Sequence, residues 1–463
     1  MILISTLLCV LIGLCVVRTA HDSPSLAEYA GLSFPLGLFT QTILMIALDA
    51  CSVPITPLSL LLADGVTLAL LGYLLHKKGV GLQDCLPFWK NVFQQLRSVN
   101  LVWLLLMGFI VWFEYQNLER CLFFPSYDRD SLVGFDTIGY VLSQEHTYKG
   151  LSLFNTEYVL DIKQTGSYIA YAPFVQLAYG YVYLFGAETS KLIPALLFLS
   201  LLIGFYAVMT RCIGKTGAAL ATLFLLLTPQ LLAFSSLSST NIMHAVFASL
   251  GTIYGLLWLK SRQQGDLALS ALLLGANCWT RSEGILFVVA LGVPLVIDSI
   301  KRTSYKHVLV WSVIALAPFI GWTVFQWIFD LRTESILITH PFWDGEKMEL
   351  IWKHIFNHFA NTFYYGWTFW FVVVSFVLNG WFLIKEKDNL TPLLVLAGSI
   401  FLYGMMLYHI NFVWDTIDNV LTHSTKRFIF CFVPIAWFYA STNKIIATPL
   451  RRIDELLTIS KVR

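Results

Sequence analysis

Runs of apolar residues, many of them close to 20 residues long, alternate with short polar segments along most of the chain. A run of about 20 apolar residues is long enough to cross a bilayer as an α-helix, and only a helix or a closed barrel satisfies its backbone hydrogen bonds in lipid. These runs are continuous rather than alternating, which excludes barrel strands. We therefore expect an all-α polytopic membrane protein. The expected spans are 1–17, 33–52, 55–75, 100–116, 188–208, 216–232, 242–259, 266–280, 284–299, 307–328, 366–384, 391–408 and 427–442.

Composition supports this class of protein. Hydrophobic residues make up 57% of the 463 residues and charged residues only 13%, whereas a soluble domain carries about 25% charged residues. The eight cysteines show neither a CxxC motif nor a metal-ligand spacing, and they indicate no disulfide framework. The first apolar run has no positive charge before it and no clear cleavage site, so we expect it to be retained as a span.

The distribution of lysine and arginine predicts the orientation. Most of the 30 basic residues fall in alternate short loops, which places those loops in the cytoplasm. The N-terminus is then outside and the C-terminus cytoplasmic. Two long segments, 117–187 and 329–365, lie on the outer face of a single transmembrane domain, 1–463. A short apolar segment near 172–186 is expected to be re-entrant or to lie on the outer interface. Short loops favour a bacterial cytoplasmic (inner) membrane.

The first outer segment carries a cluster of acids next to an amphipathic stretch. In 135–147, apolar residues recur at helical spacing, which predicts a helix lying on the membrane surface. Asp128, Asp130 and Asp136 surround its start, where the helix dipole favours anions. Taken alone, any one acid in such a loop is better explained by capping and solvation than by catalysis.

Four segments occur in a recognisable order: "DRDSLVGFDTIGYV", "YAPFVQLAYGYVYLFG", "TPQLLAFSSLSSTN" and "CWTRSEGILF". Over about residues 100 to 300 this order and spacing resemble the GT-C superfamily of membrane glycosyltransferases, in particular the bacterial branch related to protein O-mannosyltransferases and aminoarabinose transferases. The later segment "HSTKRFIF" resembles the basic stretch before a late span in that family. The resemblance implies a GT-C-like bundle, here of about 13 transmembrane helices, with juxtamembrane helices in the outer catalytic loop 117–187.

The resemblance also implies a reaction. A sugar passes from a polyprenyl-phosphate carrier in the bilayer to a glycan, lipid or protein acceptor on the outer face, with inversion at the anomeric carbon. An acid in the first outer loop serves as general base. Asp130 matches that acid, and Asp136 and Asp128 are the alternatives. General-base catalysis requires a carboxylate that takes the proton of the attacking group.

The departing lipid phosphate needs cations. Arg281, near the outer end of a span, is the first candidate, and Lys426 with Arg427 forms the second. Arginine offers a planar, bidentate fit to phosphate oxygens. Simple pairing of Arg281 with Glu283, and interfacial anchoring by Lys426 and Arg427, are equally open interpretations.

Residues expected to line the acceptor or sugar pocket are Glu145, His146, Tyr171, Asn241 and Glu283. No cofactor is required for the implied reaction, and we assign no metal ligands. The three loop carboxylates leave room for a divalent cation, Mg²⁺ or Mn²⁺, and an HxxxH pair at His354 and His358 leaves room for another metal.

Two other functions are open on sequence alone. A transporter or flippase of lipid-linked sugars would place charges at the bilayer midplane within repeated halves, and no such repeat is visible. A lipid-linked oligosaccharide ligase or polymerase shares the donor but relies on an outer arginine or histidine more than on an aspartate. The sequence favours the glycosyltransferase.

Overall fold

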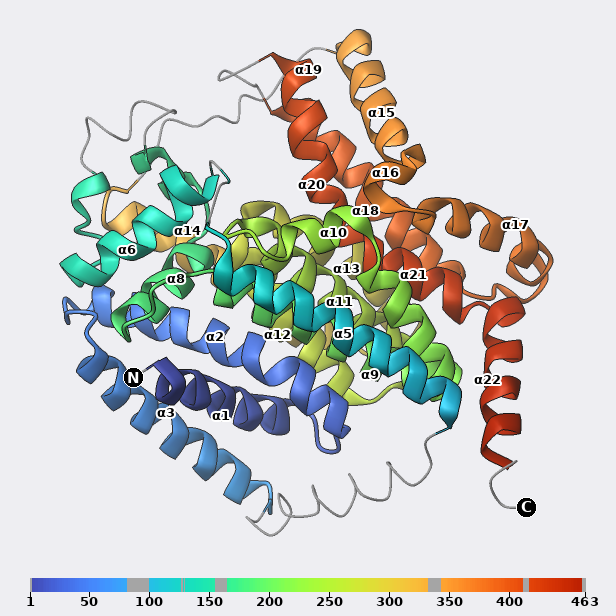
Figure 1. Cartoon of the computed structure of the whole chain (residues 1–463), viewed down its shortest axis with the longest axis horizontal. Helices are drawn as coiled ribbons and strands as arrows, with labels where there is room; N and C mark the ends of the chain where they lie inside the picture. The colour runs from blue at the N-terminus through green and yellow to red at the C-terminus, as the bar shows by residue number, and fades with distance from the viewer. Residues whose placement is uncertain are drawn as a thin grey trace.

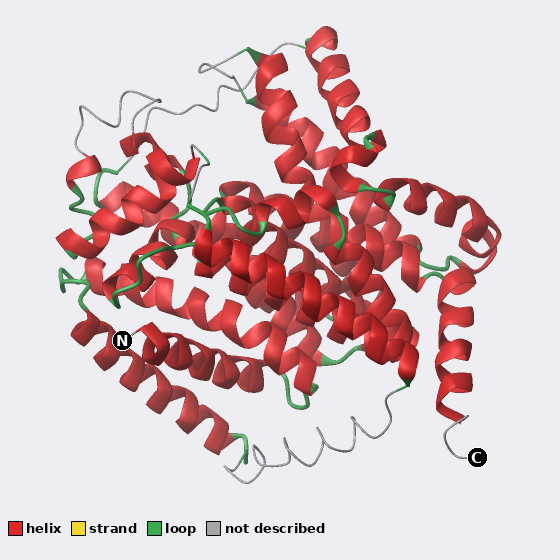
Figure 2. Cartoon of the chain, in the orientation of Figure 1, coloured by secondary structure: helices red, strands yellow, loops and turns green. Residues whose placement is uncertain are grey.

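A computed structural model describes residues 2–80, 100–125, 128, 130–154, 165–331, 343–410 and 416–459, and every regular element in these ranges is helical (Figures 1 and 2). Apolar side chains cover the outside of several helices. Leu58, Leu62 and Val66 on one face of α3 are 68%, 64% and 71% exposed, as expected for a helix that faces lipid rather than water. The expected class, an all-α multi-pass membrane protein, is confirmed.

Ten helices in the described ranges are long and apolar enough to cross a membrane, and a bent pair, Ile417–Thr442 with Lys444–Leu457, gives an eleventh if it counts as one span. The ten are α1 (Ile2–Ala20), α2 (Leu26–Ala50), α3 (Pro57–Lys77), α5 (Leu101–Phe123), α9 (Leu192–Leu226), α11 (Thr240–Ser261), α13 (Ile285–Arg302, with the preceding turn η5, Ser282–Gly284), α14 (Lys306–Ile328), α17 (Thr368–Glu386) and α18 (Leu390–His409).

This number is lower than the thirteen spans expected from the sequence, for identifiable reasons. The expected spans 188–208 and 216–232 both fall largely within the 35-residue α9. The expected span 266–280 is α12 (Gln264–Thr280), which at 17 residues is shorter than a typical span. The expected span 427–442 forms part of the bent pair.

The long helix α9 is interrupted at Gly214. Its φ of 79° lies in the left-handed region that favours glycine. Asp454 of α22 (Lys444–Ile459) caps the second half of α9, because its carboxylate accepts hydrogen bonds from the backbone N–H groups of Lys215 and Thr216, both at 3.1 Å. The hydroxyl of Thr216 donates to the same carboxylate at 2.6 Å. A distant aspartate thus serves as N-cap, and the two halves of α9 behave as separate helices.

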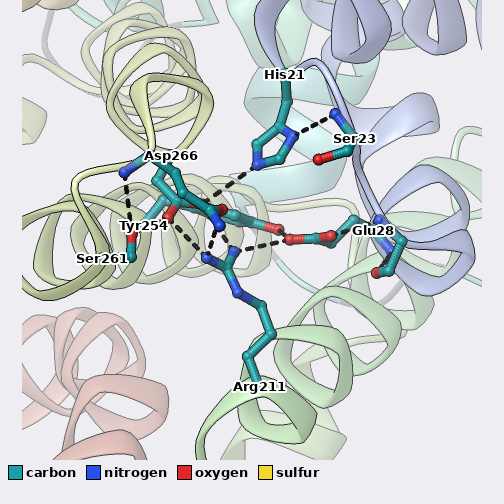
Figure 3. Close-up of polar contacts among 9 residues, drawn as sticks. His21, Ser23, Glu28, Arg211, Tyr254, Ser261 and Asp266 are labelled. Atoms are coloured by element: carbon teal, nitrogen blue, oxygen red, sulfur yellow. Dashed lines mark hydrogen bonds and ion pairs between the residues drawn. The ribbon is translucent and has the colours of Figure 1, made fainter.

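A buried network of charges joins four helices at one end of the bundle (Figure 3). Arg211 of α9 donates to both oxygens of Asp266 in α12, each at 2.7 Å, and to Glu28 of α2 at 3.1 Å. The hydroxyl of Tyr254 in α11 donates to Glu28 at 3.1 Å, and His21 lies 3.6 Å from Asp266. We call these five residues the Arg211 network. Glu28 and Asp266 are almost completely buried, so their charges depend on the guanidinium.

The acidic segment 117–187, which the sequence predicts to be outer, is attached to the opposite end of α2. Asp49, in the last turn of α2, accepts hydrogen bonds from the hydroxyl of Thr147 and the backbone N–H of Lys149, both at 2.7 Å. Helix α6 (Asp136–Glu145) confirms the helix expected in 135–147 and packs against α8 (Phe174–Leu184). A Cβ at Gly139 would lie 2.6 Å from the Cβ of Tyr179, so only glycine permits this close approach.

Helix α8 has eleven residues and is too short to cross a bilayer, in agreement with the expectation that 172–186 is not a span. The remaining elements are η2 (Asp130–Phe135), η3 (Ser152–Phe154), η4 (Thr165–Ala170), α10 (Pro229–Phe234), α15 (Gly345–Ala360), α16 (Thr362–Tyr365), α19 (Ile417–Val420), η6 (Leu421–Thr425), α20 (Lys426–Phe428), η7 (Ile429–Cys431) and α21 (Phe432–Thr442).

Arg211→Ala should destabilise the protein strongly, because it leaves two buried carboxylates without a cation. Removing one partner of a buried ion pair costs on the order of 3 kcal/mol. Thermal unfolding of the purified protein measures this as a lowered Tm. Arg262→Ala is the matched control, since Arg262 pairs with Asp298, which Arg302 also contacts. Equal losses in the two variants would contradict a special role for the Arg211 network.

Candidate active site

Asp130 is the first residue of the π-helical turn η2, which leads into α6, and two side chains hold its carboxylate. The Tyr168 hydroxyl of η4 donates to Oδ1 at 3.1 Å, and Nη1 of Arg427 in α20 donates to Oδ2 at 2.6 Å. The side chains of Asp130 and Arg427 are 33% and 22% exposed. The carboxylate expected to act as base therefore contacts one of the cations expected to bind phosphate.

Tyr168 reaches Asp130 because its ring packs directly on η2. A Cβ at Gly134 would lie 2.4 Å from Cε1 of Tyr168, so the ring fits only against glycine. Phe135 contacts Tyr168 edge to face with ring centroids 5.0 Å apart, and it contacts Tyr171 in the same way at 5.2 Å. We call Phe135, Tyr168 and Tyr171 the aromatic cluster. Edge-to-face contacts of this kind fix the orientation of the rings.

Arg281 lies on the Tyr171 side of the aromatic cluster. It follows the last residue of α12 in an extended conformation, and its guanidinium carbon lies 5.5 Å from the centroid of the Tyr171 ring. Glu283 accepts a hydrogen bond from its Nη2 at 2.8 Å, and the Thr240 hydroxyl lies 3.4 Å from its Nη1. Asp130, Arg427, Arg281, Glu283 and the aromatic cluster form one continuous site, which we call the Asp130 cluster.

The charges of the Asp130 cluster act on its neighbours. Burial raises the pKa of the Tyr171 hydroxyl, and Arg281 opposes the shift, as Arg427 does more weakly. Asp128 lies beside the cluster and accepts hydrogen bonds from the backbone N–H and the hydroxyl of Ser131, both at 3.3 Å. Burial, and then the charge of Asp130, raises the pKa of Asp128. Of these two carboxylates, Asp130 is the one that accepts a hydrogen bond from the Arg427 guanidinium.

Other residues expected at the site lie outside the Asp130 cluster. Asp136 accepts a hydrogen bond from the Tyr183 hydroxyl at 2.6 Å. Glu145 accepts one from the backbone N–H of Ser152 at 2.8 Å. Nδ1 of His146 lies 3.1 Å from the Ile55 carbonyl oxygen, in the connection between α2 and α3.

Lys426 and Asn241 border the cluster without a direct contact to Asp130. Nζ of Lys426 lies 5.7 Å from the centroid of the Tyr364 ring. The Asn241 amide donates to the Ser239 hydroxyl at 2.9 Å, and these two residues flank Thr240, whose hydroxyl lies 3.4 Å from Nη1 of Arg281. Lys426 precedes Arg427 in sequence, so both residues border the cluster.

His354 and His358, in the segment 329–365, each contact a residue of a neighbouring element. Nε2 of His354 lies 2.9 Å from Asp418, and Nε2 of His358 lies 3.4 Å from the Leu421 carbonyl oxygen. Burial lowers the pKa of His358. Positions 332–342 of this segment lie outside the described residues. Among residues that are described, no three His, Cys, Asp or Glu side chains are arranged to hold a metal ion.

Two residues of the site were missed in the sequence. Tyr168 occurs in "SYIAYAP" three positions before Tyr171, so the spacing of two tyrosines was an available signal. Thr240 ends the polar run "SSLSST", which precedes a span. Neither pattern shows which distant segment its side chain will contact, and the contact is what gives each residue a place in the site.

Residues 175–327 match the family model described as dolichyl-phosphate-mannose-protein mannosyltransferase, which is about a third of the 463 residues. The resemblance to membrane glycosyltransferases of GT-C type is confirmed over this segment, and it indicates glycosyltransferase activity. The segment includes Arg281 and Glu283, whereas Asp130 and Arg427 lie outside it. Comparisons with curated proteins and with solved structures found no match.

The contact between Asp130 and Arg427 can be tested by a double-mutant cycle on thermal unfolding. Asp130→Asn, Arg427→Gln and the double variant should show a coupling energy of about 1 kcal/mol, because the two side chains share a hydrogen-bonded ion pair. Asp136→Asn combined with Arg427→Gln serves as control and should be additive. Additivity in the Asp130 cycle would show that the two groups do not meet in solution.

Proposed function

We propose that this chain transfers a sugar from a polyprenyl-phosphate carrier to a hydroxyl or amine of a glycan, lipid or protein on the outer face of the membrane. The observation that carries the proposal is the Asp130 cluster, in which two carboxylates and two guanidinium groups, paired as Asp130–Arg427 and Glu283–Arg281, lie beside a small group of aromatic rings. Arg281 belongs to the segment that matches the glycosyltransferase family model. A carboxylate beside cations is the combination that transfer from a phosphate leaving group requires.

In the proposed reaction the acceptor oxygen or nitrogen attacks the anomeric carbon from the face opposite the phosphate. The bond from the acceptor to this carbon forms as the bond to the phosphate oxygen breaks, and the carrier phosphate leaves with the electron pair. Asp130 takes the proton of the acceptor. Because attack and departure are in line, the configuration at the anomeric carbon is inverted.

Arg427 links the two halves of this reaction. It pairs with Asp130 at 2.6 Å while that carboxylate is ionised. When Asp130 takes the acceptor proton it becomes neutral, and the attraction between the pair weakens. The guanidinium is then available to the carrier phosphate at the moment when the phosphate gains charge. Proton removal and stabilisation of the leaving group are therefore coupled through one side chain.

Arg281 holds the phosphate throughout in this proposal. Its guanidinium is kept in place by Glu283 at 2.8 Å and by the Tyr171 ring. Arginine presents parallel donors that match two phosphate oxygens. Lys426 adds a positive charge next to Arg427 in sequence. A divalent cation remains a prediction from the sequence alone, and no step here uses one.

The outer location rests on the direction of α12. This helix begins beside the Arg211 network, at the end where the basic loops gather, and finishes immediately before Arg281. If the basic loops are cytoplasmic, the Asp130 cluster faces the other side. A carrier lipid in that leaflet has its phosphate at the interface, which is where the cations of the cluster would meet it.

Asp130→Asn should abolish sugar transfer, with a loss of about 100-fold or more, because the amide cannot accept the acceptor proton. Mass spectrometry of the lipids and glycans from a deletion strain that carries each variant measures the product. Asp136→Asn is the matched control and should retain activity, since Asp136 bonds to Tyr183 rather than to the cluster. Wild-type product in the Asp130 variant would rule out its role as the base.

Arg281→Ala should weaken binding of the lipid-phosphate donor roughly 30-fold, which corresponds to about 2 kcal/mol. Arg281→Lys should recover part of that loss, because it restores the charge without the bidentate geometry. The KM for donor measured in membranes reports the effect, with Arg262→Ala at the opposite end of the bundle as control. Unchanged donor KM in the alanine variant would contradict a phosphate role for Arg281.

A further inference from the structure

A cavity of about 390 Å³ lies between the ends of α1 and α3 and the beginnings of α12 and α14. Ligand sites in proteins occupy roughly 300–1,000 Å³. Gln264, the first residue of α12, lines this cavity, whereas Arg281 follows the last residue of the same helix. The 17 residues of α12 rise about 25 Å. The cavity therefore lies at the end of the bundle remote from the Asp130 cluster.

The lining of the cavity changes from basic to apolar along α14. Lys306 and His307 lie in its first turn, Val310 and Trp311 in the next, and Ile314 one turn deeper. This spacing places all five on one face of the helix. Val310 is 46% exposed, so the apolar part of the cavity reaches the surface that faces lipid.

The wall formed by α12 follows the same order. Gln264 and Gly265 line the cavity at the polar end, and Leu267, Ala268 and Ala271 line it further along the helix. The cavity thus has a polar mouth and, about two helical turns further along, an apolar interior. This order of polarity matches an amphiphilic ligand with a polar headgroup and an apolar chain.

The mouth of the cavity favours an anion. Its one acid among the lining residues, Asp22, pairs with Lys78 at 3.2 Å, and Lys78 also donates to the Thr19 carbonyl oxygen at 2.7 Å. Lys306 is the further lysine at the mouth, and His307 lies next to it.

The Arg211 network keeps a further acid away from this mouth. Asp266 follows the lining residue Gly265, but both its oxygens accept hydrogen bonds from Arg211 in the buried network (Figure 3). His21, which lies 3.6 Å from Asp266, packs so close to Gly265 that a Cβ there would be 2.4 Å from its ring. The network therefore fixes the start of α12 against the α1–α2 turn, and it forms a rigid base for the cavity.

We propose that this cavity binds a membrane lipid with a phosphate headgroup, drawn from the leaflet at the basic end of the bundle. The phosphate lies at Lys306, and the apolar chain runs past Val310 and Trp311. The phosphate-bearing lipid is either a phospholipid or a free polyprenyl phosphate, which share this chemistry. The site is separate from the proposed donor site, because α12 lies between them.

Native mass spectrometry of the purified full-length protein tests the proposal with phosphatidylglycerol, a polyprenyl phosphate, and diacylglycerol of matched chains. We expect retention of one phosphate-bearing lipid and none of diacylglycerol, and the better retained of the first two identifies the source. Lys306→Glu should reduce retention about tenfold. Lys301→Glu is the matched control, since Lys301 is a lysine at the same end that does not line the cavity.

Ala268→Trp provides a second variant, because it fills the apolar part of the cavity without changing charge, and it should reduce retention as Lys306→Glu does. Equal retention in the Lys306→Glu and Lys301→Glu variants, or displacement of the lipid by inorganic phosphate alone, would overturn the proposal. Arg281→Ala should leave retention at this site unchanged. Failure of the lipid site is thus distinguishable from failure of the proposed donor site.

Discussion

The ion pair between Asp130 and Arg427 is the contact on which the site depends. The two residues are 297 positions apart, yet a guanidinium nitrogen lies 2.6 Å from a carboxylate oxygen. Without this contact, η2 after α5 and the basic turn before α21 would be unrelated parts of a helical bundle. Both side chains are only partly exposed, so each needs the other as a counter-charge. The pair places a base candidate beside a phosphate-binding candidate.

Among the described residues, two groups of ion pairs lie at opposite ends of α12. The Arg211 network satisfies two buried carboxylates at one end, and the Asp130 cluster joins Asp130 and Glu283 to arginines at the other. Helix α12 connects them, with Asp266 in its first turn and Arg281 just after its last residue. A rigid helix held at both ends keeps the position of Arg281 independent of the surrounding loops.

The sequence predicts the spans well and the contacts poorly. Apolar length and the break at Gly214 are local, and so is the amphipathic pattern that became α6, so all are readable from the chain. Arg281 pairing with Glu283 was one open interpretation, and the structure contains it together with the Tyr171 contact. Glu145 and Asp130 are both loop acids in sequence. Only the fold shows that Glu145 accepts a hydrogen bond from the nearby backbone N–H of Ser152, whereas Asp130 accepts one from the distant Arg427.

The central claim is that a carrier phosphate binds between Arg281 and Arg427. A cryo-electron microscopy structure of the full chain with a bound polyprenyl-phosphate sugar tests it most directly. We expect the phosphate within hydrogen-bonding distance of the Arg281 guanidinium, on the side that faces Arg427, with Arg427 still paired to Asp130 and the anomeric carbon facing Asp130. A phosphate that makes no contact with Arg281 would rule the proposed donor site out.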